Sequence, residues 1–211
     1  MNEIILKNIS KQYDFILFEN VNVRFQSGCV TTIKGHNGSG KTVLLKIIAG
    51  LIKPTSGEIL YNHLKSGKDF KIIPELGAFF SKCEFFGNMS AIENLELLAS
   101  LKNSITKEDI IKSLEKVGLD PYNKTPVKKY SLGMKQRLGI AQAIMEYSDV
   151  LILDEPTNAL DSEGRKLIYN IIREQKELGK IIIMTSHYEE EIIALSDEIY
   201  EFRGGSIEKV K

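Results

Sequence analysis

The segment Gly35–Thr42, Gly-His-Asn-Gly-Ser-Gly-Lys-Thr, has the residue types and spacing of a phosphate-binding loop. Its glycines allow a tight turn in which backbone N–H groups converge on phosphate oxygens, and the N-terminus of a following helix adds partial positive charge. We expect Lys41 to reach the β and γ phosphates and the hydroxyl of Thr42 to bind Mg²⁺. A glycine-rich turn that matches by accident is the alternative. It is disfavoured because a predicted strand, Val30–Lys34, precedes the loop and a helical pattern, Val43–Ala49, follows it.

Two acids follow a second apolar run. Val150–Leu153 predicts a buried strand, and Asp154 and Glu155 come directly after it. The carboxyl end of a parallel strand is the edge where such sheets bind ligands. We expect Asp154 to hold Mg²⁺ through water, and Glu155 to orient and deprotonate the water that attacks a γ-phosphate. Solvated acids at a strand end are the alternative, and a neighbouring phosphate loop makes it the weaker one.

Of the three histidines, only His187 lies where it could take part in this chemistry. It follows the predicted strand Ile181–Thr185, so it belongs to the same sheet edge, where its ring can hydrogen-bond a γ-phosphate oxygen. An isolated histidine is more often structural. The side chains of His36 and His63 are expected to be exposed.

Elements along the rest of the chain must bring these segments together. Ile4–Ile9 and Val21–Phe25 predict short strands near the start, and capping boxes that begin at Ser90 and Thr106 predict two helices, the second ending at Gly118. In the last third, a strand, helix, strand pattern predicts a βαβ unit with a parallel sheet. The apolar positions that define these helices are Leu95, Leu98 and Leu101, then Ile110, Ile111, Leu114 and Val117, then Leu167, Ile168, Ile171, Ile172 and Leu178.

Composition narrows the function classes. The 28 basic and 28 acidic side chains cancel, so no overall positive field attracts a nucleic-acid backbone, and we expect no nucleic-acid partner. No apolar run approaches the roughly 20 residues that span a bilayer, and the start Met1–Glu3 lacks the basic region of a signal peptide. Cys29, in a predicted buried strand, and Cys83 are far apart without metal-ligand spacing, which favours structural thiols in a reducing cytosol.

Taken together, the motifs resemble those of the ATP-binding subunits of the ATP-binding cassette (ABC) family, over almost the whole chain. Gly50–Ile59 looks like the segment that follows the phosphate loop in that family. Tyr130–Arg137 is similar to its signature motif, in a variant form. Asp154–Asp161 resembles the acidic strand end with the inter-subunit loop, and Thr185–His187 resembles the histidine switch.

The resemblance implies an α/β fold with a P-loop NTPase (RecA-like) core and a parallel sheet, an N-terminal antiparallel β-subdomain and an inserted α-helical subdomain. The single domain 1–211 would place the core and β-subdomain in 1–80 and 147–211, and the helical subdomain with the signature motif in 81–146. It also implies a head-to-tail dimer, with itself or a related cassette, in which ATP is held between one subunit's phosphate loop and the other's signature motif.

Site roles follow from the resemblance, position by position. Ser131 could cap a helix whose N-terminus, with the Gly133 amide, faces the γ-phosphate; taken alone, the segment is only a capped basic helix. The residues implied to contact ATP are Tyr13 (stacked on adenine), Gly35, His36, Asn37, Gly38, Ser39, Gly40, Lys41, Thr42, Val43, Ser131, Gly133 and Asp161. The implied catalytic residues are Glu155, His187 and Lys41, and the implied Mg²⁺ contacts are Thr42, Asp154 and Ser81.

Two positions depart from the family pattern. Ser81 stands where members usually carry Gln or Glu, and because serine is shorter, a bridging water or Glu84 would have to substitute. Val43 replaces the usual second hydroxyl residue, which predicts weaker binding without loss of function. The phenylalanines that flank Ser81 could line a groove for a membrane subunit's helix or form the core of the helical subdomain: Phe79, Phe80, Phe85 and Phe86.

The signature variant and the run Ser90–Leu95 look most like export-type subunits associated with bacitracin and lantibiotic resistance. We therefore expect a cytoplasmic ATPase, peripheral on the inner face of the cell membrane, that drives export through a separate integral-membrane permease. One alternative is a soluble cassette ATPase that acts on nucleic acid or ribosomes. Another is a module that senses ATP with little hydrolysis.

Overall fold

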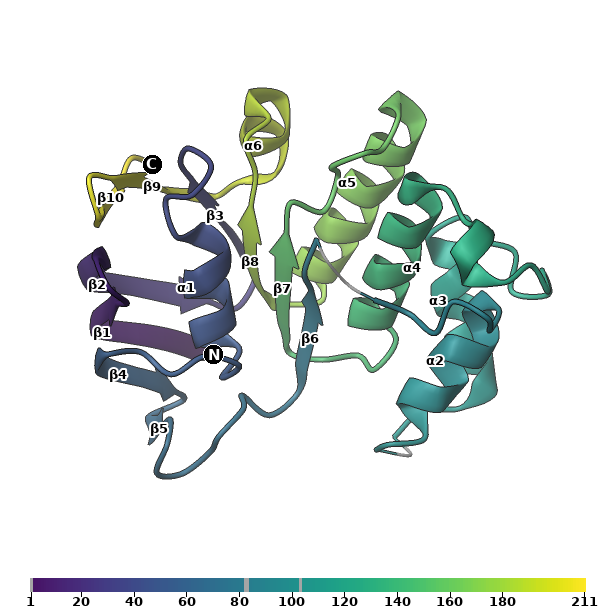
Figure 1. Ribbon diagram of the computed structural model, residues 1–211, viewed down its shortest axis with the longest axis horizontal. Coiled ribbons are helices and arrows are strands. Elements are labelled where there is room, and N and C mark those ends of the chain that lie inside the picture. The colour runs from purple at the N-terminus through teal and green to yellow at the C-terminus, as the bar shows by residue number, and fades with distance from the viewer. Residues whose placement is uncertain (1, 82–83, 103) are drawn as a thin grey trace.

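Two sheets and a group of helices make up the chain, which the computed structural model describes over residues 2–81, 84–102 and 104–211 (Figure 1). The strands are β1 (Glu3–Gln12), β2 (Ile16–Gln26), β3 (Cys29–Lys34), β4 (Ser56–Tyr61), β5 (Leu64–Lys65), β6 (Leu76–Phe79), β7 (Val150–Asp154), β8 (Ile181–Thr185), β9 (Glu198–Arg203) and β10 (Ser206–Lys209). The helices are α1 (Lys41–Ile48), α2 (Ala91–Ala99), α3 (Lys107–Lys116), α4 (Leu132–Ile144), α5 (Ser162–Glu177) and α6 (Glu189–Leu195), with a 3₁₀ turn η1 (Val127–Lys129).

A six-stranded sheet, in the order β10-β9-β3-β8-β7-β6, forms the centre of the fold. The pairs β6·β7, β7·β8, β8·β3 and β3·β9 are parallel, and β10 is antiparallel to β9. The segments that follow β3, β8 and β7 therefore emerge next to one another at one edge of the sheet. The predicted α/β fold with a parallel sheet is confirmed.

The buried strands β7 and β8 send alternate side chains to two cores. Val150 and Ile152 pack in a cluster with α1 and the antiparallel sheet, whereas Leu151 and Leu153 pack in a cluster with the helices α2 to α5. Because both faces are covered, a continuous apolar run is what such a strand requires. In Figure 1, α1 and the antiparallel sheet accordingly lie on one side of the central sheet and α4 on the other.

The antiparallel sheet has the order β2-β1-β4-β5 and lies beside α1 (Figure 1). Its strands β1 and β2 are longer than the apolar runs predicted, because their ends alternate polar and apolar residues and still pair along the backbone. β3 begins one residue earlier than predicted, at Cys29, which is half-buried there instead of fully buried. Cys83 lies outside the described residues.

Both predicted capping boxes are present, at Ser90 of α2 and Thr106 of α3, and Gly118 follows α3 with a φ of 69°. Two predicted core positions are wrong. Leu101 and Leu178 are 80% and 63% exposed, because α2 ends at Ala99 and α5 at Glu177, before either leucine could turn inward. Within the described part of the chain, no helix has both the length and the hydrophobicity that crossing a membrane requires.

The four phenylalanines near Ser81 have different surroundings. Phe79 is fully buried against α4, and Phe85 packs partly against the same helical core. Phe80 packs instead against the cluster around α1, and Phe86 is exposed. The structure therefore divides the four between core and surface.

Candidate functional site

The loop between β3 and α1 is shaped by glycines that no other residue could replace without strain. Gly35 has a φ of 155°, and a Cβ there would lie 2.9 Å from Oγ of Ser39. Gly40 has a φ of 104°, and its Cβ would lie 2.9 Å from the ring of Phe18. The helix α1 begins at Lys41, two residues before the start that the apolar pattern predicted. The free N–H groups of its first turn are therefore part of this loop.

Lys41 lies inside the loop with its cation poorly hydrated. Its Nζ donates hydrogen bonds to the carbonyl oxygens of Gly35 (2.7 Å) and His36 (3.0 Å). Burial lowers the pKa of Lys41, although the nearby carboxylates of Glu155 and Asp154 act in the opposite direction. A cation that has lost water gains most from an anionic ligand, and a phosphate at this loop would provide one.

Ser39 supplies a second feature that fits a phosphate ligand. Its Oγ is buried and has no hydrogen-bond partner among the described residues. A buried hydroxyl without a partner is costly, so a native structure is expected to pair it. Its position inside the phosphate loop makes a phosphate oxygen a suitable partner.

Asp154 joins the loop to the central sheet. It is only 2% exposed, and both carboxylate oxygens accept hydrogen bonds from hydroxyls: Oδ2 from Thr42 (2.9 Å) and Oδ1 from Thr185 (2.8 Å). Thr42 opens α1 and Thr185 ends β8, so one carboxylate holds together segments from three elements. The hydroxyl of Thr42 and the carboxylate of Asp154 are hard oxygen donors of the kind that Mg²⁺ prefers.

Glu155 adopts a backbone conformation that is unusual for its type. Its φ is 52°, a left-handed value that costs a non-glycine residue of order 1–3 kcal/mol. Its N–H donates to Oγ1 of Thr185 (2.9 Å), and its carbonyl accepts from Nε2 of Gln136 on α4 (2.8 Å). The Oε2 atom accepts from Asn158 (3.3 Å), while Oε1 lies 3.5 Å from Nδ1 of His187. Thr185 and Gln136 therefore hold the backbone of Glu155, while its carboxylate lies between Asn158 and the imidazole of His187.

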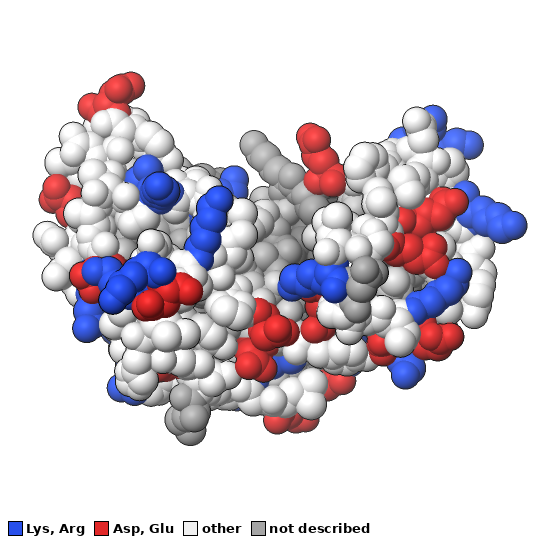
Figure 2. Space-filling view, turned by 90° about the horizontal axis from the view of Figure 1, so that it is seen from below, with Lys and Arg blue, Asp and Glu red and all other residues white. Residues whose placement is uncertain are grey.

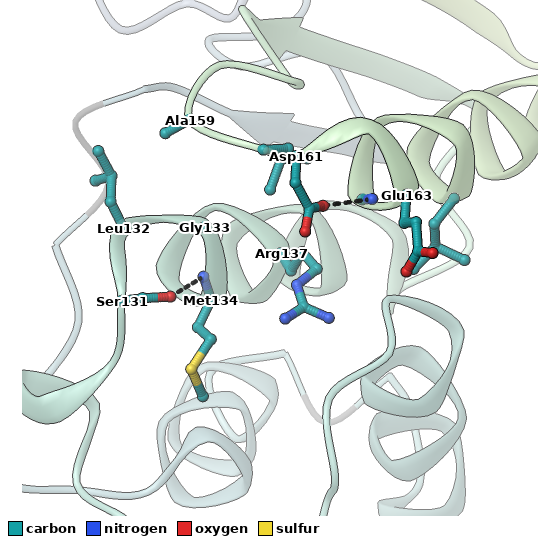
Figure 3. Close-up of a pocket in the computed structure, with 11 residues that line it drawn as sticks. Ser131, Leu132, Gly133, Met134, Arg137, Ala159, Asp161 and Glu163 are labelled. Atoms are coloured by element: carbon teal, nitrogen blue, oxygen red, sulfur yellow. Dashed lines mark hydrogen bonds between the residues drawn. The ribbon is translucent and has the colours of Figure 1, made fainter.

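The predicted signature segment opens α4, beside a cavity of about 640 Å³ (Figure 3). Ser131 caps α4 by accepting a hydrogen bond from a backbone N–H of its first turn (3.2 Å), and Asp161 caps α5 by accepting from the N–H of Gly164 (2.8 Å). A Cβ at Gly133 would lie 3.2 Å from the carbonyl oxygen of Ala159, so the two segments are in close contact. No described residue of the phosphate loop lines this cavity.

The remaining predicted site residues lie at the edges of these two regions. Tyr13 is half-exposed in the turn between β1 and β2, with Nζ of Lys11 4.8 Å from its ring centre. Ser81 is exposed; it comes two residues after Phe79, whose register partner is Leu153. Val43 is partly buried against the cluster around α1. The exposed loop residues are His36, Asn37 and Gly38.

Four hydrogen bonds at the site were not predicted from the sequence. They are made by three residues, Thr185, Gln136 and Asn158, each of which bonds to Asp154 or Glu155. The sequence held one indication of the role of Thr185, because this polar residue directly follows the apolar run Ile181–Met184. The contact of Gln136 joins residues 19 positions apart, and local spacing does not reveal such a pair.

The fold and the site define the class of P-loop nucleoside triphosphatases. Comparison with known proteins gives the family: the family described as ABC transporter matches residues 18–158. An uncharacterized ABC transporter ATP-binding protein of Bacillus subtilis is 40% identical over 192 residues, which cover 91% of this chain and 88% of that protein. The chain belongs to the ABC transporter family; it is an ATP-binding protein and an ATPase of that family.

Two further relatives and a solved structure support the same family assignment. The lantibiotic transport ATP-binding protein SrtF of Streptococcus pyogenes is 36% identical, covering 92% of this chain and 84% of its own length. The bacitracin transport ATP-binding protein BcrA of Bacillus licheniformis is 40% identical, and the match covers 86% of this chain and 60% of that protein. A dimeric bacterial ABC transporter cassette superposes with a TM-score of 0.87 at 25% identity, covering 99% of both chains.

The shared hydroxyl of Thr185 gives a testable consequence. Thr185→Val keeps the shape of the side chain but leaves Asp154 without one donor and the N–H of Glu155 without its acceptor. We expect the free energy of unfolding to fall by about 1–3 kcal/mol and ATP turnover to fall with it. Urea unfolding and steady-state hydrolysis measure the two effects.

Thr32→Val is the matched control, because Thr32 is equally buried and, among the residues that the structure describes, its hydroxyl bonds only to Ser196, away from the site. It should lose stability and keep its turnover per folded molecule. Equal turnover losses in the two variants would mean that the hydroxyl of Thr185 matters only for folding.

Proposed function

We propose that this chain is the ATP-hydrolysing subunit of an export-type transporter, that it dimerises head-to-tail on Mg-ATP, and that it drives a separate integral-membrane permease from the cytoplasmic face of the membrane. The observation that carries the dimer is the separation of the two half-sites. The phosphate loop leads into α1, which packs in the core on one side of the central sheet. The cavity lined by Ser131 lies at the start of α4, which packs in the core on the other side. A second copy is needed to bring the two together.

In the proposed mechanism, the chain's own groups bind the triphosphate and prepare the water. Lys41 and the amides of its loop hold the β and γ phosphates. Glu155 orients the attacking water and accepts its proton, and His187 holds a γ-phosphate oxygen. Thr42 and Asp154 would hold Mg²⁺, which neutralises phosphate charge. The N-terminus of the partner's α4, capped at Ser131, would face the γ-phosphate.

A role in transport is supported by the names of the relatives, since SrtF and BcrA are a lantibiotic and a bacitracin transport ATP-binding protein. The dimeric cassette supports a dimer of this chain as well. We further propose that residues 81–146 form the helical subdomain and that exposed residues near its start, such as Phe86, contact the permease. Ser81, at the same junction, would reach Mg²⁺ or the water only through a bridging water.

The two alternatives have less support. Figure 2 shows one face of the molecule, on which basic and acidic side chains are interspersed without a continuous area of one sign. Nucleic-acid binding generally requires such a basic area. A module that senses ATP without hydrolysing it would not need the backbone of Glu155 held by Thr185 and Gln136 with its carboxylate against His187.

Removing the proposed general base tests the chemistry. Glu155→Gln keeps the shape and the hydrogen bonds of the backbone but cannot take a proton, so steady-state ATP turnover should fall by about 100-fold or more while ATP still binds. Glu177→Gln is the control. It changes an exposed acid at the C-terminal end of α5 and should behave like the wild type. Wild-type turnover in Glu155→Gln would overturn the assignment of this residue.

The dimer is tested with an exposed side chain of the signature segment. Leu132 is 65% exposed and lines the cavity, so Leu132→Glu should leave the monomer folded but put negative charge against the partner's γ-phosphate. In the Glu155→Gln background with Mg-ATP, we expect dimers by sedimentation velocity, and monomers that still bind ATP once Leu132→Glu is added.

Leu178→Glu is the control. Leu178 is 63% exposed and directly follows the C-terminal end of α5, whereas the cavity lies at the N-terminal end of that helix. It should still form dimers. Dimers in the presence of Leu132→Glu would contradict a head-to-tail arrangement through the signature segment.

Coupling to a permease is tested by the effect of membranes on turnover. Vesicles from the source cell should stimulate ATP hydrolysis several-fold, and liposomes of the same extracted lipids should not. Stimulation by nucleic acid or ribosomes instead would favour the soluble alternative. Negligible turnover with every addition would favour the sensing module.

A further inference from the structure

Glu191 is a buried carboxyl that lies behind the site. It is on α6, is 0% exposed, and forms no salt bridge with any described residue, whereas its neighbours Glu189 and Glu190 are exposed. Burying an acid without a cation is costly. Its position therefore requires compensating contacts.

The contact that the structure shows is with the loop after β8. The hydroxyl of Ser186 donates a hydrogen bond to Oε2 of Glu191 and also accepts one from the N–H of Tyr188 (3.1 Å). The Oγ1 of Thr157 and the Oε1 of Glu191 are both buried, and neither has a hydrogen-bond partner among the described residues. Ser186 precedes His187 in the loop after β8, and Thr157 follows Glu155 in the loop after β7.

The surroundings of Glu191 act on its pKa in two opposite directions. Burial raises the pKa of Glu191, while the hydroxyls of Ser186 and Thr157, and then the charges of His187 and Arg165, act in the opposite direction. In its protonated form, the carboxyl can donate to one hydroxyl and accept from the other.

Ring contacts on the more exposed side link the loop after β8 to the start of α5. The rings of His187 and Tyr188 lie 4.2 Å apart, centre to centre, at an interplanar angle of 36°. The guanidinium of Arg165 lies 5.5 Å from the centre of the Tyr188 ring, and the N–H of Arg165 donates to the carbonyl of Asp161 (2.9 Å). The start of α5 is therefore also linked to the histidine.

We propose that Glu191 is a positioning residue for hydrolysis: by holding Ser186, the residue before His187, it sets the imidazole of His187 against the carboxylate of Glu155. No hydrogen bond joins Glu191 to a described residue of the phosphate loop. Thr185 already fixes the start of both loops at Asp154 and Glu155, and Glu191 fixes the loop after β8 further along the chain. The inference rests on the roles proposed above for His187 and Glu155.

Kinetics of two variants and a control test the role. Glu191→Ala should lower kcat about 10- to 100-fold, with KM for ATP nearly unchanged, because the reacting groups are displaced while the phosphate loop is intact. Glu191→Gln should recover most of the rate, since an amide can accept from one hydroxyl and donate to the other. Glu190→Gln, an exposed neighbour, should match the wild type.

An NMR measurement separates positioning from a loss of stability. His187 is one of three histidines, and the exposed His36 and His63 serve as internal references. In Glu191→Ala the ring resonance of His187 should shift, while the other two stay in place. In a His187→Ala background, Glu191→Ala should cause no further loss of rate.

The outcomes distinguish this inference from the proposed function. A wild-type kcat in Glu191→Ala, or a reduced kcat with an unmoved His187 resonance, would overturn the role of Glu191. If instead Glu155→Gln and His187→Ala both turn over ATP at the wild-type rate, the proposed mechanism itself is wrong.

Discussion

The buried carboxylate of Asp154 is the interaction on which the rest of the site depends. Both its oxygens are bound by hydroxyls, one from Thr42 at the start of α1 and one from Thr185 at the end of β8. These contacts need β3, β8 and β7 to be adjacent and parallel, in a register that aligns Asp154 with Thr185. The continuous apolar runs of the strands serve that register, because they bury both faces of the sheet. Fold stability and site geometry are therefore set by the same packing.

The helical core is connected to the chemistry through one amide. Gln136 lies in the first half of α4, the helix that opens at Ser131, and it donates to the carbonyl of Glu155. The cap of α4 and the residue that holds the backbone of Glu155 are thus separated by little more than one helical turn. On the proposed dimer, closure of a partner's nucleotide onto Ser131 would act on a helix that holds the other site's Glu155. The geometry supports communication between the two sites through a rigid element.

Local patterns predicted the sheet, the phosphate loop and both capping boxes, because period, glycine placement and caps are properties of neighbouring residues. They failed where an element ends: Leu101 and Leu178 continue a helical period past the last helical residue. They also could not supply contacts between distant segments, such as those of Gln136 with Glu155 and of Thr185 with Asp154. A buried glutamate in the run Glu189–Glu191 looks like its exposed neighbours until the fold places it.

Charge explains why such a site would need both a metal ion and a second subunit. Lys41 is a single buried cation beside two carboxylates, Asp154 and Glu155, and burial already disfavours its charged form. A triphosphate adds several negative charges to this group, and one lysine cannot balance them. Mg²⁺ held at Thr42 and Asp154 would offset part of the excess, and the positive end of a partner's α4 would offset more at the γ-phosphate. Hydrolysis and release of phosphate would remove that negative charge and weaken the contact, which is the physical basis for an ATP-dependent dimer.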